Sequence, residues 1–130
     1  MEQTIKIKKK KHNVAIDDVN KLIVASMQDI KAKDIVSLDL RDITEAVTDY
    51  FVICNADSTT QVRAIASHIV EEAQKQLGVR KLRIEGKSNG EWVLIDFGDV
   101  VAHVFQTEKR EFYQLEDLWS DAIRTEHLSA

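Results

Sequence analysis

The feature that most constrains the fold is a series of three short apolar segments separated by glycine-containing turns. Residues 82–85, 91–97 and 100–105 are rich in Val, Leu and Ile. Asn89-Gly90 lies between the first two segments and Gly98-Asp99 between the last two. Both dipeptides favour the positive-φ turns of β-hairpins. The pattern predicts three consecutive antiparallel strands.

A helix is predicted immediately before these strands. Ser58 and Gln61 have the spacing of a capping box, in which the Ser58 hydroxyl accepts from the Gln61 backbone N–H and the Gln61 side chain reaches back to the Ser58 N–H. Gly78 is suited to the left-handed residue that ends a helix. The apolar residues between them follow helical spacing: Val62, Ile65, Ala66, Ile69, Val70, Ala73 and Leu77.

The remaining segments complete a mixed α/β pattern. A helix is predicted from Asp17 and Asp18 to about residue 32, and a half-buried strand over residues 35–40. Residues 50–54 form a continuous apolar run, typical of a central strand covered on both sides. A final helix is predicted from five large apolar residues: Phe112, Leu115, Leu118, Trp119 and Ile123. The predicted order is α-β-β-α-β-β-β-α, an α+β mixed sheet with helices packed on it.

Length and charge limit the domain organisation and the partners. The 130 residues contain no proline and suit one domain, predicted over residues 16–124 between a flexible basic tail (1–15) and a C-terminal tail (125–130). Residues 1–12 hold five Lys and one Glu, a charge of +4, so the remainder of a chain with net charge −4 carries −8. An acidic body favours a basic protein partner and repels phosphate backbones, which disfavours broad binding to nucleic acid. We also expect no direct sequence-specific binding to nucleic acid. The Lys-rich tail is interpreted as solvated, with RNA contact as the alternative.

The apolar runs are too short to span a bilayer and no signal-peptide pattern is present, so we expect a cytoplasmic protein that does not bind a membrane. The single cysteine, Cys54, excludes an internal disulfide. It is interpreted as a small buried hydrophobe, and His103 as a hydrogen-bonded structural residue. A nucleophilic pair formed by Cys54 and His103 stays open as an alternative.

The chain shows little sign of catalytic or metal chemistry. The histidines and the cysteine lack metal-ligand spacing. Two aspartates near strand ends could converge to hold Mg²⁺ for nucleotidyl transfer, but there is no Asp-x-Asp pair and no Gly-rich phosphate loop. These aspartates are interpreted as turn and cap residues: Asp39, Asp49, Asp57, Asp96 and Asp99. We therefore expect no catalytic residue, no metal and no cofactor.

Several blocks of the chain resemble one family. The blocks are residues 49–54 (DYFVIC), Ser58 and Gln61, residues 90–105 (GEWVLIDFGDVVAHVF), Arg110 and Tyr113, and residues 115–119 (LEDLW). In this order and spacing, over about residues 17–121, the chain resembles the ribosomal silencing factors, also called Iojap-like proteins. It departs from the usual family pattern at Ala56, where Gly is frequent, and at Thr60, where Arg is common. Both positions lie at a predicted helix entry.

The resemblance implies a fold related to nucleotidyltransferases but without their catalytic residues. It implies binding to the large ribosomal subunit through its ribosomal protein fourteen, on the face that meets the small subunit. Such binding would block subunit joining and repress translation when nutrients are limiting. Two other functions stay open, a nucleotidyltransferase-like enzyme and a generic protein-binding module. The oligomeric state also stays open, with a homodimer formed through the sheet as one alternative.

The partner-binding surface is predicted around the hairpin at residues 91–105. Trp92 and Phe97 are aromatics at strand ends, where such residues often anchor interfaces, although pattern alone slightly favours packing under the last helix. Because side chains alternate along a strand, Trp92 and Asp96 share one face, and Phe97 joins them only if a bulge turns it. The predicted partner-binding residues are Trp92, Asp96, Phe97, Gly98, Val100 and Tyr113.

Overall fold

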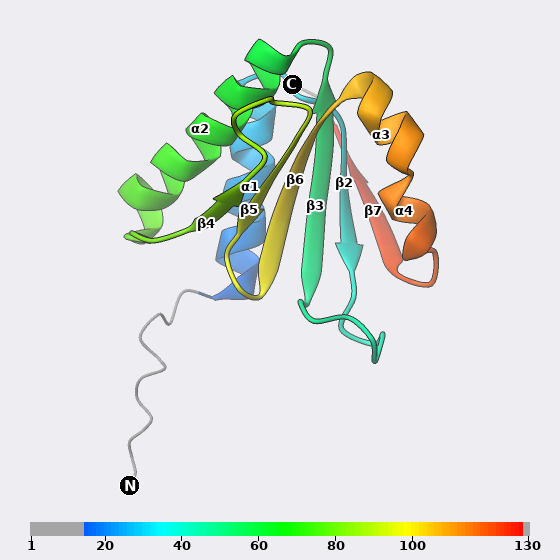
Figure 1. Ribbon diagram of the computed structural model, residues 1–130. Helices are drawn as coiled ribbons and strands as arrows, with labels where there is room; N and C mark the ends of the chain where they lie inside the picture. The colour runs from blue at the N-terminus through cyan, green and yellow to red at the C-terminus, as the bar shows by residue number, and fades with distance from the viewer. Residues whose placement is uncertain (1–14, 129–130) are drawn as a thin grey trace, which may run out of the picture.

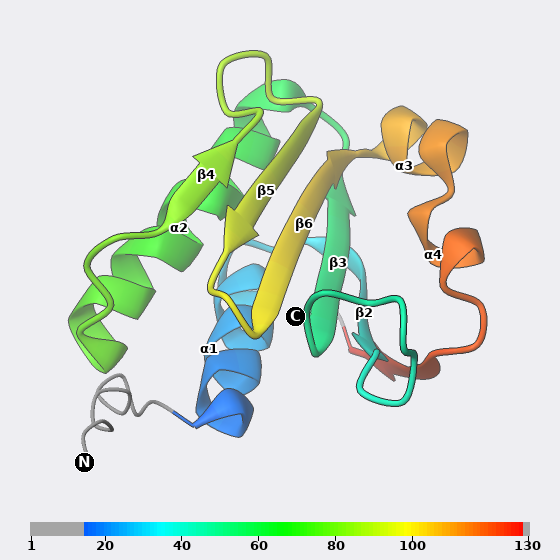
Figure 2. The same ribbon diagram turned by 60° about the horizontal axis from the view of Figure 1, so that its bottom comes forward.

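The computed structural model describes residues 15–128 (Figure 1). The predicted basic tail therefore lies outside the described residues except for Ala15. The fold is one six-stranded mixed sheet in the order β4-β5-β6-β3-β2-β7. Two long helices, α1 (Ile16–Asp29) and α2 (Thr59–Leu77), cover one face of it. Two short helices, α3 (Thr107–Tyr113) and α4 (Leu115–Leu118), lie on the other side of the sheet (Figure 2).

The strands pair antiparallel except at the centre of the sheet. Their bounds are β2 Lys33–Asp39, β3 Tyr50–Ala56, β4 Arg83–Glu85, β5 Trp92–Asp96, β6 Val100–Gln106 and β7 Ile123–His127. β3 and β6 are parallel neighbours, and helix α2 lies on the connection between them. β4, β5 and β6 are consecutive antiparallel neighbours. The predicted antiparallel series is therefore confirmed.

The turn between β5 and β6 sets the register of the hairpin. Gly98 has a φ of 92°, and the Phe97 backbone N–H donates to the Val100 carbonyl at 2.8 Å. With only Gly98 and Asp99 in the loop, Trp92 lies opposite Phe105 and Leu94 opposite His103. The β4–β5 connection is longer, and at Gly86 (φ 83°) an added Cβ would overlap the Trp92 carbonyl oxygen.

Helix α2 begins and ends where the sequence predicts. The Ser58 hydroxyl accepts from the Gln61 backbone N–H at 3.1 Å, and Gly78 ends the helix with a φ of 66°. The predicted reciprocal bond of the capping box, from the Gln61 side chain to the Ser58 N–H, is wrong. The Gln61 amide donates instead to the Ile30 carbonyl at 3.4 Å, which satisfies a carbonyl at the end of α1.

The C-terminal region differs from the prediction of a single helix. Gln114 adopts a left-handed conformation (φ 49°) that separates α3 from α4. The chain then forms β7, which pairs antiparallel with β2, with Leu38 opposite Arg124. The edge of β2 presents unpaired N–H and C=O groups, and pairing with β7 satisfies them. The predicted domain boundary at residue 124 therefore falls inside a strand, because the sheet continues to His127.

Apolar side chains form a core on each face of the sheet. The larger core lies beneath α1 and α2 and includes Ile23, Met27 and Ile65. The smaller core lies beneath α3 and α4 and contains Val36, Leu38, Leu40, Ile53, Phe105 and Leu115. Buried Val36 and Leu38 alternate along β2 with half-buried Ser37 and Asp39, so the predicted half-buried strand is confirmed. Within residues 15–128, no helix has the length and apolar character needed to span a membrane.

Candidate docking surface

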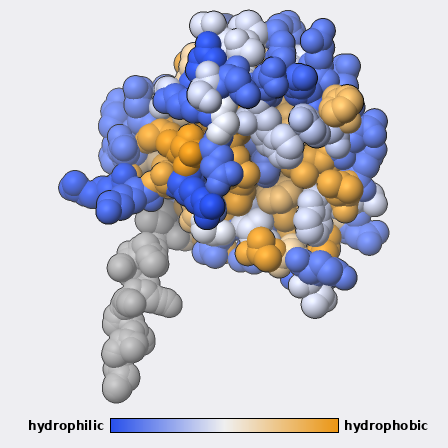
Figure 3. Space-filling view, viewed as in Figure 1, coloured by the Kyte–Doolittle hydropathy of each residue, from blue (hydrophilic) through white to orange (hydrophobic). Residues whose placement is uncertain are grey.

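The candidate site is the side of the sheet that faces away from α1 and α2, on the strands β3, β5 and β6. We call it the open face, because Figures 1 and 2 show no helix over its β5 side. Alternate residues of the strands point to it, whereas Val93 and Ile95 are buried toward α1 and α2. Figure 3 is viewed from the same side as Figure 1, and it shows apolar side chains exposed on this side of the molecule. The open face is formed by Phe51, Trp92, Leu94, Asp96, Val101, His103 and Phe105, with Tyr113 from α3.

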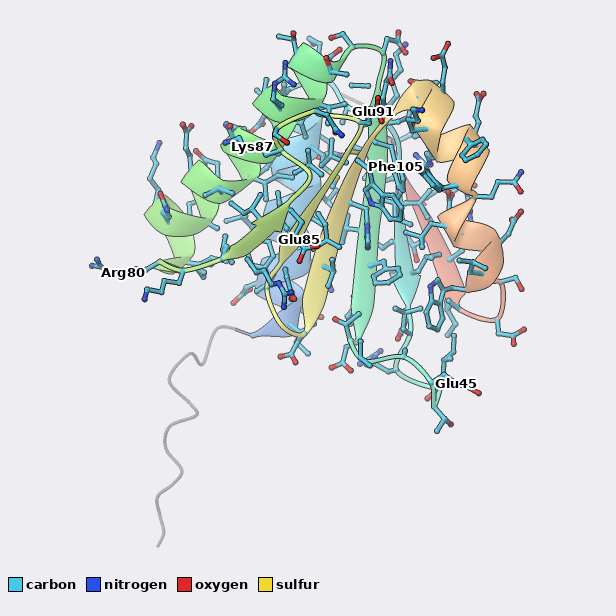
Figure 4. All side chains as sticks on the ribbon, viewed as in Figure 1. Glu45, Arg80, Glu85, Lys87, Glu91 and Phe105 are labelled. Carbon is cyan, nitrogen blue, oxygen red and sulfur yellow. The ribbon has the colours of Figure 1, made fainter. Side chains whose placement is uncertain are left out.

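Aromatic rings gather around Trp92. The indole stacks on Phe105 with centroids 4.7 Å apart, and the Tyr113 ring lies 5.0 Å away. Phe105, labelled in Figure 4, lies between β6 and α3. Trp92 itself is half-buried and Tyr113 is 48% exposed. Aromatic rings that are packed on one side and exposed on the other suit a protein interface.

A hydrogen bond to His103 fixes the orientation of the Trp92 ring. The indole Nε1–H donates to Nδ1 of His103 at 3.0 Å, and the Phe51 ring forms a T-shaped pair with the imidazole, with centroids 4.5 Å apart. Because Nδ1 accepts this bond, the imidazole proton is on Nε2. Burial lowers the pKa of His103 to about 3, so the ring is neutral near physiological pH. The hydrogen-bonded structural role predicted for His103 is confirmed.

A buried ion pair holds α3 and α4 beside the open face. The Arg110 guanidinium donates to both Glu116 carboxylate oxygens, at 2.8 and 3.1 Å. It also donates to the Asn55 side chain at 2.8 Å and to the Asp34 carbonyl at 2.6 Å. These hydrogen bonds and charges hold the pKa of Glu116 below its usual range. Arg110 thereby connects α3 and α4 to the ends of β2 and β3.

Comparison with known proteins identifies the family. The chain matches the family described as "RsfS: Ribosomal silencing factor during starvation" over residues 13–130. It belongs to the ribosomal silencing factor family. The resemblance found in the sequence is therefore confirmed, and with it membership in the Iojap-like group.

Individual members of the family show the same relationship. "Ribosomal silencing factor RsfS" of Bacillus subtilis is 44% identical over 102 residues, 78% of this chain and 85% of that protein. "Mitochondrial assembly of ribosomal large subunit protein 1" of Mus musculus is 41% identical over 76 residues, 56% of this chain and 33% of that protein. The crystal structure of protein CV0518 from Chromobacterium violaceum matches with a TM-score of 0.76 and 34% identity, covering 82% of this chain and 88% of that one.

The predicted partner-binding residues divide between the two faces of the sheet. Trp92, Asp96 and Tyr113 belong to the open face, and Gly98 is exposed in the turn beside it. The Asp96 carboxylate accepts from the Gly98 N–H at 2.7 Å, so it also stabilises that turn. The β5–β6 pairing contains no bulge, so the condition under which Phe97 would share the face of Trp92 is not met.

Phe97 and Val100 lie on the other side of the sheet. Phe97 is half-buried against the larger core and lines a groove with Val19 and Leu82. Val100 is 1% exposed in the same core. Neither side chain is presented on the open face.

The sequence analysis did not select five residues of the open face as binding candidates: Phe51, Leu94, Val101, His103 and Phe105. A signal for four of them was present. A two-residue turn at positions 98 and 99 places Asp96 opposite Val101, Leu94 opposite His103 and Trp92 opposite Phe105, so that these side chains share the Trp92 face. Phe51 joins them through the parallel pairing of β3 with β6, which no local pattern specifies.

The alternative catalytic groupings are not assembled in residues 15–128. Cys54 points into the larger core and His103 to the open face, so the predicted alternative of a nucleophilic pair is wrong. Burial raises the pKa of the Cys54 thiol to about 12. In this part of the chain, no three or more His, Cys, Asp or Glu side chains gather as a metal site. Asp57 instead binds Lys33 at 2.7 Å and Thr107 at 2.9 Å.

Proposed function

We propose that this protein binds the large ribosomal subunit and sterically blocks its joining to the small subunit, repressing translation when nutrients are limiting. The contact is with ribosomal protein fourteen, on the face of the subunit that meets the small subunit. The observation that carries this proposal is the aromatic open face, in a chain that belongs to the ribosomal silencing factor family. The name of the mouse relative, which refers to the ribosomal large subunit, supports the choice of subunit.

Charge supports a basic protein as the partner. Residues 13–130 contain 13 Lys and Arg against 21 Asp and Glu, a net charge of −8. Opposite charge accelerates the encounter of two proteins and excludes partners of like charge. A basic ribosomal protein is therefore a better partner for this acidic chain than exposed ribosomal RNA, whose phosphates are also negative.

The geometry of the open face suits the binding of a partner better than it suits catalysis. Trp92 presents one side of its ring while Phe105 and His103 hold the other, so little side-chain freedom is lost on docking. A rigid aromatic at the centre of an interface often supplies much of the affinity. A factor that blocks subunit joining needs only affinity and bulk at the right place, and it would act in the cytoplasm, where translation occurs.

Sucrose-gradient sedimentation tests the proposal. Purified protein is mixed with separated large and small subunits, under conditions that allow joining. We expect the protein to sediment with large subunits and not with small ones, and the fraction of joined ribosomes to fall as protein is added. Unchanged joining at saturating protein would contradict the proposal, and binding to neither subunit would favour a generic protein-binding module with another partner.

The homodimer stays a prediction at this stage. The open face is an apolar surface through which two copies could also pair, and pairing would compete with ribosome binding. Analytical ultracentrifugation of the free protein measures the oligomeric state directly.

A further inference from the structure

His103 is the most deeply buried polar side chain of the open face. It is 3% exposed, on β6 opposite Leu94 of β5 and beside Ile53 of β3. The residue belongs to the strand that carries Phe105, labelled in Figure 4. Its Nδ1 accepts from the Trp92 indole at 3.0 Å, so one ring nitrogen is occupied by the main aromatic of the surface.

The other ring nitrogen, Nε2, has a proton to donate and no acceptor for it. The bond from Trp92 fixes the tautomer, because an imidazole nitrogen that accepts a hydrogen bond cannot carry the proton. Within residues 15–128, Nε2 is buried and has no hydrogen-bond partner. Buried donors in folded proteins are nearly always paired, and leaving one unpaired is costly. The described part of the protein therefore supplies a hydrogen-bond partner for Nδ1 but none for Nε2.

The side chains over the imidazole are themselves partly exposed. The Phe51 ring forms a T-shaped pair with the imidazole, with centroids 4.5 Å apart, and Trp92 and Leu94 are half-buried beside it. Changes in surface rotamers are common when proteins dock, so a shift of the half-buried Phe51 or Leu94 side chain can open a path to Nε2 while the Trp92 ring keeps its place.

The partner's chemistry limits what can accept this proton. The acidic charge of the chain favours a basic partner, and Lys and Arg side chains contain no acceptor atom. On a basic protein surface acceptor side chains are sparse, whereas every residue of the main chain carries a carbonyl oxygen.

We propose that His103 is a specificity-determining residue of the open face, whose Nε2–H donates to a main-chain carbonyl oxygen of the docked protein. This inference rests on the proposed function, since it assigns one contact within that interface. It requires a partner segment with a free carbonyl above the aromatic rings. A partner surface without one leaves the His103 donor buried and unpaired.

A comparison of two variants isolates the Nε2–H donor. Trp92→Phe removes the indole N–H but keeps His103 able to donate. In Trp92→Phe/His103→Phe neither side chain has a polar atom, so the free protein is left with no unpaired group at the site. We expect the double variant to bind large subunits about tenfold more weakly than Trp92→Phe, because the partner carbonyl loses its donor. Trp92→Phe/His103→Gln restores an N–H donor and should recover most of the loss.

The outcomes separate this inference from the proposed function. Equal affinity of Trp92→Phe and Trp92→Phe/His103→Phe would overturn it, since His103 would then act only by holding Trp92. Failure of the wild-type protein to bind large subunits would refute the proposed function itself, and this inference with it.

A spectroscopic measurement covers the case in which the double variant does not fold. In wild-type protein labelled with ¹⁵N-histidine, the Nε2–H resonance should move downfield and exchange more slowly when isolated ribosomal protein fourteen is added. An unchanged resonance in a complex that forms would overturn the inference.

Discussion

Trp92 is both packed and exposed, and this dual position decides what its removal should do. Its ring contacts Phe105, Tyr113 and His103, yet it is only half-buried. We expect Trp92→Ala to lower the affinity for large subunits about thirtyfold, roughly 2 kcal/mol, while the fold is kept. Sedimentation with large subunits and thermal unfolding of the same preparation measure the two effects.

Phe97→Ala is the matched control for Trp92→Ala. It removes an aromatic from the opposite end of the same hairpin segment, but on the side that packs against the larger core. It should therefore lower thermal stability and leave the binding of the folded protein unchanged. Had Trp92 only a core role, Trp92→Ala would instead cost roughly 3–5 kcal/mol of stability and the folded fraction would bind normally.

His103 makes stability depend on pH. Burial lowers its pKa from an ordinary value of 6.5 to about 3, so between these values the unfolded chain binds a proton that the folded protein does not. The free energy of unfolding should therefore fall as the pH is lowered below about 6.5, by up to about 1.4 kcal/mol per pH unit. Urea denaturation at several pH values measures the slope. His103→Phe should give a flatter profile, and an equal slope would contradict the assignment.

At the scale of elements, α3 and α4 are held more by polar contacts than by apolar burial. α3 has no buried residue and α4 buries only Leu115. The ion pair of Arg110 and Glu116 is 10% and 17% exposed, and it also binds Arg124 of β7 at 3.0 Å. Tyr113, the neighbour of Trp92, is positioned by this network.

Arg110→Ala should release α3 and α4 together. Removing one partner of a buried pair leaves the other charge unpaired, so we expect a loss of about 3 kcal/mol in the free energy of unfolding. Large-subunit binding should also weaken, since Tyr113 would no longer support Trp92. Denaturant unfolding and sedimentation measure both.

The exposed pair of Arg83 and Glu85 provides the comparison for Arg110→Ala. Its side chains are 74% and 55% exposed, so Arg83→Ala should change stability by about 1 kcal/mol or less. The pair with Arg110 contributes its stability only while Glu116 is ionised. Its lowered pKa means that this contribution is present above about pH 4.5 and is lost as the pH falls through the folded-state value. Normal stability and binding in Arg110→Ala would show that apolar contacts alone hold these helices.

At the scale of the whole molecule, Asp57 lies at the opposite end of the strands from the other aspartates considered as magnesium ligands: Asp39, Asp49, Asp96 and Asp99. Asp49 and Asp99 precede the parallel strands β3 and β6, whereas Asp57 follows β3. The seven residues of β3 separate Asp49 from Asp57 by roughly 26 Å, whereas oxygen ligands lie about 2 Å from Mg²⁺, so Asp57 cannot share an ion with the others. Within residues 15–128, no three or more His, Cys, Asp or Glu side chains gather as a metal site.

We therefore predict no nucleotidyl transfer by this protein. Incubation with labelled nucleoside triphosphates, Mg²⁺ and candidate acceptors should give no product above background. Asp96→Asn and Asp99→Asn serve as controls, because product that disappears in either variant would revive the enzyme interpretation.

The sequence by itself determined the features that depend on residues close together in the chain, such as helix ends, turns and the alternation of side chains along a strand. The helix from Thr59 to Leu77 is bounded by the Ser58 cap and Gly78, and the turn at Gly98 requires a positive φ. The alternation along β5 separates Trp92 from Phe97, because consecutive side chains point to opposite faces whatever surrounds the strand. The family was also identifiable from the order and spacing of its motifs.

Only the tertiary structure decided which segments meet. Residues 123–127 form a strand because the edge of β2 offers backbone partners, and this outweighs the helical spacing of the preceding apolar residues. The parallel pairing of β3 with β6 brings Phe51 beside His103, although 52 positions separate them in the sequence. The open face exists because α1 and α2 both cover the other side of the sheet. That choice follows from burying the largest apolar area, a property of the whole fold that no local pattern specifies.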